Sequence, residues 1–108
     1  MIRHCVMLRL KPDHDTAELA AVMDGLGVVA DRLSGCGGFI HGPNRDFEAK
    51  SPSYPYGFTL DFAAQADLQR YASDETHQQL GARLVALCVD GAEGVLVFDL
   101  ETPDAADQ

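Results

Sequence analysis

Residues 56–62 read Tyr-Gly-Phe-Thr-Leu-Asp-Phe, and residues 71–77, about one helix length later, read Tyr-Ala-Ser-Asp-Glu-Thr-His. Large apolar side chains alternate with other residues in the first stretch, which predicts a strand over 55–62 with one buried face. In the second, Ser73 and Asp74 are residue types that cap helix N-termini, so we expect a helix over 64–73 and a second over 75–88. A strand followed by a split helix is the centre of the predicted fold.

The rest of the chain adds strands and helices on both sides of this centre. Residues 2–10 alternate, which predicts a strand with His4, Val6 and Leu8 on one face. Apolar residues at helical spacing predict a helix over 15–33, followed by a strand over 36–42, a loop over 43–54 and a last strand over 93–100. The order β-α-β-β-α-β predicts an α+β, ferredoxin-like fold with a four-stranded antiparallel sheet and helices on one face.

Length and composition restrict the class of protein. A chain of 108 residues fits one domain, which we place at residues 1–100, with residues 101–108 as an acidic flexible tail. The net charge of -9 and scattered basic residues argue against nucleic-acid and membrane binding. Three widely spaced cysteines without a CxxC pair, and no secretory signal, indicate a reduced, cytoplasmic protein. The four histidines lack metal-ligand spacing, so neither a metal nor a cofactor is predicted.

The uncovered sheet face predicts a partner. With helices on one side only, a half-apolar face stays bare, and a second copy of the chain is the simplest cover. We therefore expect a homodimer formed through the open sheet face.

Tyr71, His77 and His4 are the candidate catalytic residues. His77 falls in the first turn of a helix, where the helix dipole disfavours imidazolium, so a neutral ring able to accept a proton is expected. Tyr71 is a hydrogen-bond donor for a developing oxyanion. If both point toward the sheet they meet His4, and the apolar side chains of that face form a small-molecule pocket. Its predicted substrate-binding residues are Val6, Leu8, Tyr56, Phe58 and Leu60.

Several motifs together resemble one family. These are the opening Met-Ile-Arg-His-x-Val-x-Leu-x-Leu-Lys-Pro, the tripeptide Gly42-Pro43-Asn44, the strand ending in Asp61-Phe62, and Tyr71 followed by His77. The chain resembles the stress-responsive α/β-barrel (Dabb) domain family over residues 1–100. The resemblance implies a ferredoxin-like monomer and a homodimer whose two sheets close into an α/β barrel.

The resemblance also implies an activity. The family includes plant stress proteins and a plant polyketide cyclase that performs a cofactor-free aldol cyclisation with a Tyr and a His at the places of Tyr71 and His77. By this resemblance His77 is the general base, Tyr71 the partner of the carbonyl oxygen, and His4 a pocket histidine. The chain differs at Tyr56, where the cyclase has another His. Some relatives hold a cation on backbone carbonyls at the end of the first helix.

Three functions are compatible with the sequence. The first is a small apolar, carbonyl-bearing ligand with cofactor-free cyclase, lyase or isomerase chemistry. The second is a non-enzymatic, stress-related binding or structural barrel, in which Tyr71 and His77 only hold the helix junction. The third is a cofactor-free monooxygenase of the related dimeric α+β barrels.

Overall fold

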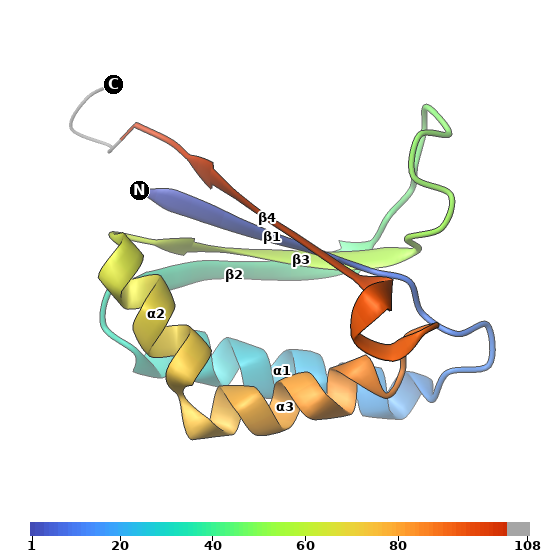
Figure 1. Cartoon of the computed structure of the whole chain (residues 1–108), viewed down its shortest axis with the longest axis horizontal. Helices are drawn as coiled ribbons and strands as arrows, with labels where there is room; N and C mark the ends of the chain where they lie inside the picture. Colours follow the sequence, from blue (N-terminus) through green and yellow to red (C-terminus); the bar gives the residue numbers. More distant parts are fainter. Residues whose placement is uncertain (104–108) are drawn as a thin grey trace.

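The computed structural model describes residues 1–103, and the fold is one sheet with helices against one of its faces (Figure 1). The strands are β1 (Ile2–Leu8), β2 (Cys36–Pro43), β3 (Tyr56–Phe62) and β4 (Val95–Glu101). The helices are α1 (Thr16–Arg32), α2 (Gln65–Ser73), α3 (Glu75–Val85) and a short 3-10 helix, η1 (Gly91–Gly94). Four antiparallel strands in the order β2-β3-β1-β4 confirm the predicted ferredoxin-like fold.

The predicted element boundaries shift by a few residues. β1 ends at Leu8 rather than residue 10, and Leu10 instead forms an isolated bridge to Cys88. η1 precedes β4, which therefore begins at Val95 rather than residue 93. The predicted tail overlaps β4, since Glu101 is its last residue; residues 104–108 lie outside the described part of the chain.

Asp15 and Asp74 begin the two longer helices. The Asp15 carboxylate accepts hydrogen bonds from the backbone N–H groups of Ala17 and Glu18, at 3.0 and 3.1 Å. The Asp74 carboxylate accepts from the N–H of His77 at 2.9 Å. Both satisfy donors that the first helical turn leaves unpaired, so the predicted split of the second helix at residue 74 is confirmed.

The core lies between the sheet and the helices. Because strand side chains alternate, the inner face collects the apolar residues of β1 and β3, and α1 adds an apolar stripe against them. The side chains with almost no exposed surface are Leu8, Val22, Met23, Leu26, Val29, Leu60, Phe62, Tyr71 and Cys88.

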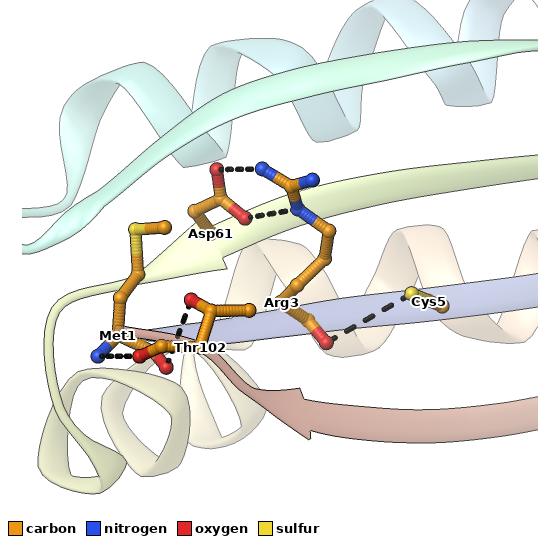
Figure 2. Close-up of polar contacts among 5 residues, drawn as sticks. All are labelled: Met1, Arg3, Cys5, Asp61 and Thr102. Atoms are coloured by element: carbon orange, nitrogen blue, oxygen red, sulfur yellow. Dashed lines mark hydrogen bonds and ion pairs between the residues drawn. The ribbon is translucent and has the colours of Figure 1, made fainter. Parts of the chain in front are cut away.

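The opposite face of the sheet is not covered by any helix of residues 1–103 (Figure 1). Figure 2 shows polar contacts of β1 with its neighbours at one end of the sheet: Arg3 of β1 forms a two-bond ion pair with Asp61 of β3, at 2.9 and 3.2 Å. The backbone of Met1 and Thr102 extends the β1–β4 pairing beyond Glu101, through a 2.8 Å bond from the Thr102 N–H to the Met1 carbonyl. The large apolar residues exposed on this face are Ile40, Leu96, Phe98 and Leu100.

Gly94, at the end of η1, has no room for a side chain. An added Cβ would stand 2.2 Å from the carbonyl oxygen of Val89 and 3.2 Å from Cβ of Cys88. Backbone cannot move as a flexible side chain does, so we expect Gly94→Ala to lower the free energy of unfolding by roughly 3 kcal/mol, measured by urea denaturation.

Gly81, inside α3, provides the matched control. A Cβ added at Gly81 would meet no atom within 4 Å apart from its own helix backbone and chain neighbours. Alanine is the better helix former, so Gly81→Ala should raise the free energy of unfolding by about 0.5–1 kcal/mol. Equal effects of the two substitutions would contradict the packing described for Gly94.

Candidate functional site

His4 lies on β1, one of the two inner strands of the sheet, on the face that the helices cover. It lies opposite Leu60 of β3 and Asp99 of β4. Its ring meets Phe62 and Tyr71 edge-on, with centroids 5.7 and 6.1 Å apart. His4 Nδ1 lies 2.6 Å from Oδ1 of Asp99, so a carboxylate fixes the orientation of the ring.

Tyr71 fills the space between α2 and the sheet. Only 2% of its surface is exposed, and its ring centroid lies 5.3 Å from that of Phe62. Its hydroxyl oxygen is buried and has no hydrogen-bond partner among the described residues. An unpaired buried hydroxyl costs free energy, so this one calls for a functional explanation.

His77 is held against Tyr71 by the start of α3. Asp74 caps α3 and also accepts two hydrogen bonds from Arg32, at 3.0 and 3.1 Å, which ties the junction to the end of α1. The His77 and Tyr71 ring centroids are only 4.0 Å apart. Nδ1 of His77 is the second buried polar atom without a partner among residues 1–103.

Burial sets the protonation state of both groups. Desolvation lowers the pKa of His77, and the nearby His4 lowers it further, while a hydrogen bond to the Ala72 backbone and the charge of Asp74 oppose the shift. Desolvation also raises the pKa of the Tyr71 phenol far above its usual value. At neutral pH the site therefore holds a neutral imidazole beside a protonated phenol.

This pair has the properties of a base next to a hydrogen-bond donor. A neutral imidazole accepts a proton, and a phenol that does not ionise donates a hydrogen bond to an oxygen that gains negative charge. The apolar surroundings strengthen both interactions because little water screens them.

The other predicted site residues divide into two groups. Val6, Leu8, Phe58 and Leu60 are buried in the core on the inner sheet face, as the alternation predicted. Tyr56 is not brought to His4. It pairs with Leu8, four residues along β3 from Leu60, which places it about 13 Å away along the strand. Its hydroxyl instead lies 2.6 Å from Nδ1 of His41.

Asp99 is a site residue that the sequence patterns above did not identify. The alternation in the last strand did predict its face, because Asp99 follows Val95 and Val97 at a spacing of two and so lies on the same face. Its side chain lies on the edge strand and is 41% exposed, so burial alone did not require a partner. Only the register between β1 and β4 identifies that partner as His4.

Lowering the pH should destabilise the protein through His77. A histidine whose folded pKa lies below its ordinary value of 6.5 binds more protons when unfolded, so stability falls as the pH drops through 6.5 toward the folded pKa. The loss is at most about 1.4 kcal/mol for each unit of difference between the two pKa values.

Urea denaturation at pH 7 and pH 5 measures this loss, and His77→Gln should reduce it. Carboxylates whose pKa is held low, such as Asp74, lose their contribution only in a more acidic range, below about pH 4. If His77→Gln lost as much free energy of unfolding between pH 7 and pH 5 as the unmodified protein, the pKa of His77 would not lie below its ordinary value.

Within residues 1–103, no three or more His, Cys, Asp or Glu side chains are grouped so as to hold a metal ion. No helix in this part of the chain is both long and apolar enough to cross a bilayer.

Comparison with known proteins places this chain in a family. The family model described as Stress responsive A/B Barrel Domain (Dabb) matches residues 2–102. A dimeric ferredoxin-like protein of unknown function from Jannaschia sp. CCS1 is 46% identical, with 94% of this chain and 98% of that chain covered and a TM-score of 0.89.

Two more distant structures share the fold. A Dabb family protein from Mesorhizobium loti is 23% identical, with 95% of this chain and 97% of that chain covered and a TM-score of 0.70. The hydroxynitrile lyase from Passiflora edulis is 12% identical, with 96% and 94% covered and a TM-score of 0.78. Comparison with curated proteins found no match. The chain therefore belongs to the stress-responsive A/B barrel (Dabb) domain family.

Proposed function

We propose that this protein binds a small apolar molecule with a carbonyl group, and that His77 and Tyr71 carry out cofactor-free acid–base chemistry on it, of the cyclase, lyase or isomerase type. One observation carries the proposal. Tyr71 Oη and His77 Nδ1 are both buried without a partner among the described residues, on rings whose centroids are 4.0 Å apart. Two orphaned polar atoms on adjacent buried rings are what a polar group of a ligand would satisfy.

The proposed step is proton abstraction next to the carbonyl. His77 takes the proton from the α carbon, the electrons of the broken C–H bond form a carbon–carbon double bond, and the π electrons of the carbonyl group move to its oxygen, which gives an enolate. Tyr71 donates a hydrogen bond to that oxygen, where the negative charge develops. The enolate then takes the proton back from His77 or attacks an electrophilic carbon of the same molecule.

The surroundings favour an apolar substrate. Val6 and Leu60 lie on the inner face of the sheet near His4. A hollow of about 300 Å³ adjoins the His4–Asp99 pair, between α2 and the edge of β4; it is lined by Ile2, Gln65, Leu68, Asp99 and Glu101. Leu68 and Tyr71 are one helical turn apart on α2, so this hollow is the proposed approach to the phenol.

The homodimer is part of the same proposal. Ile40, Leu96, Phe98 and Leu100 expose between 42% and 66% of their surface on the sheet face opposite the helices. Such a patch is typical of an interface, and the 46% identical Jannaschia protein is described as dimeric. Two copies joined through this face would close a barrel with the Tyr71–His77 pairs on its outer side, under the helices.

A non-enzymatic barrel is the second candidate. The observation that favours it is the packing of Tyr71, which is only 2% exposed among Phe62, His4 and His77, as a purely structural aromatic would be. In that case the pair only holds the junction between α2 and α3.

Tyr71→Phe separates the two candidates. It removes the orphaned hydroxyl and keeps the ring, so we expect the free energy of unfolding to stay equal or to rise by about 1 kcal/mol. Under the first proposal ligand binding and turnover fall in the same variant, which is a loss of function without a loss of stability. Unchanged ligand binding and turnover in Tyr71→Phe would favour the structural role, in which only the packing of the ring matters.

Ligand binding tests the proposal directly. We expect 2-indanone, an apolar ketone with acidic α hydrogens, to shift the NMR signals of the Tyr71 and His77 rings, while those of His41 and Tyr56, at the other end of the sheet, stay unchanged. If no ketone of this size moves the Tyr71 and His77 signals, the pair does not form a binding site.

A further inference from the structure

A second hollow lies at the other end of the sheet, away from Tyr71 and His77. It is bounded by the first half of α1, the turn before it, and the ends of β2 and β3, and its volume is about 400 Å³. Tyr56 lines it, and the strand register puts Tyr56 about 13 Å from His4. This hollow is therefore separate from the site described above.

The base of the hollow is apolar. Leu10 and Leu19 line it and are each only 7% exposed, and Pro55 and Ala20 extend the apolar surface toward its mouth. A ligand that covered this surface would need an apolar body of a few carbon atoms to gain hydrophobic free energy.

The polar side chains at the edge of the hollow supply hydrogen-bond acceptors. Asp24 contributes a carboxylate from α1. His14 Nδ1 donates a 2.8 Å hydrogen bond to the Lys11 carbonyl oxygen, so in the uncharged form of the ring Nε2 is an acceptor. Of the described residues that line the hollow, none is a lysine or an arginine. A ligand that complements these groups is a hydrogen-bond donor with positive charge.

Two aromatic rings on the wall of the hollow also favour a positively charged ligand. The His41 and Tyr56 rings lie 6.0 Å apart, and the 2.6 Å hydrogen bond between His41 Nδ1 and the Tyr56 hydroxyl holds them together. The face of a tyrosine ring attracts cations, and a ring fixed by a hydrogen bond loses little freedom on binding. The net charge of -9 draws cations to the protein as a whole.

We propose that this hollow binds a small apolar amine in its protonated form. The ammonium group would contact Asp24 and the Tyr56 ring, and the hydrocarbon part would cover Leu10 and Leu19. Tyr56 would then belong to the amine site and take no part in the chemistry at His77.

Binding of 2-phenylethylamine tests the proposal. We expect saturable NMR shifts of the His41 and Tyr56 ring signals below about 10 mM amine, with the His77 signals unchanged. Phenylacetate, which has a similar size and the opposite charge, should bind at least tenfold more weakly. Asp24→Asn should weaken amine binding by about two- to fivefold, as expected for an exposed ion pair.

Asp31→Asn is the matched control, because Asp31 is an exposed aspartate of the same helix that does not line the hollow. It should leave the affinity unchanged, and so should His77→Gln. Four results would overturn the proposal: no saturable binding of the amine, equal binding of phenylacetate, an equal loss in Asp31→Asn, or a loss in His77→Gln. An equal loss in Asp31→Asn would show general attraction to an acidic surface, and a loss in His77→Gln would place the amine beside His77.

Discussion

His77→Gln is expected to lower the rate of α-proton exchange of a bound ketone by about 10² to 10⁴, the usual contribution of a general base. Glutamine keeps polarity and similar size but cannot take a proton. The physical basis is the protonation state of His77, because burial lowers its pKa and keeps the ring neutral at pH 7. Incorporation of deuterium into 2-indanone in D₂O, followed by NMR, measures the rate.

Gln79→Ala is the control for this variant, since Gln79 is an exposed residue of the same helix. Its exchange rate should equal that of the unmodified protein. If His77→Gln also exchanged at the unmodified rate, His77 would not be the base, and the non-enzymatic interpretation would gain support.

Phe98→Asp is expected to raise the dissociation constant of the proposed dimer by at least about 10²-fold. Phe98 is 42% exposed, and its neighbours on β4, Leu96 and Leu100, are similarly exposed on the face opposite the helices. A carboxylate placed there would lose its hydration in the interface without gaining a partner. Sedimentation velocity over a range of concentrations measures the effect.

Val28→Asp is the matched control, because Val28 is 65% exposed but lies on α1, on the other side of the sheet from the bare face. It makes the same change of chemistry outside the proposed interface. Dissociation by Val28→Asp but not by Phe98→Asp would place the interface on the helices. Circular dichroism should show that both variants keep the fold, since both side chains are exposed.

Local patterns in the sequence were sufficient to predict the architecture. Alternation over residues 2–10 placed His4 on the inner face with Val6 and Leu8, because side chains of a strand alternate whatever their neighbours are. Asp74 marked the break between α2 and α3, because a capping carboxylate acts within three residues of itself.

Contacts between distant residues could not be predicted in the same way. The His4–Asp99 pair spans 95 positions and depends on the register between β1 and β4. The His41–Tyr56 pair depends on an irregularity in β2 between Gly37 and Ile40, where Gly38 adopts a φ of +63°. An extra residue in a strand moves the following side chains to the other face, so His41 faces the same side as Phe58.

The structure therefore brings together the candidate residues that come from neighbouring elements and leaves the distant one, Tyr56, apart from them. His4, Tyr71 and His77 meet, through contacts among β1, α2 and α3. Tyr56 shares their sheet face, but a face is several residues long, and sharing it does not bring side chains together.

The pH dependence of the exchange rate tests the central claim most directly, which is that His77 acts as a buried base beside Tyr71. The rate of deuterium incorporation should rise with pH to a plateau, with its midpoint at the pKa of the His77 ring measured by NMR in the same protein, below the ordinary value of 6.5. A midpoint at or above 6.5, or one that differs from the titration of His77, would contradict this role of His77.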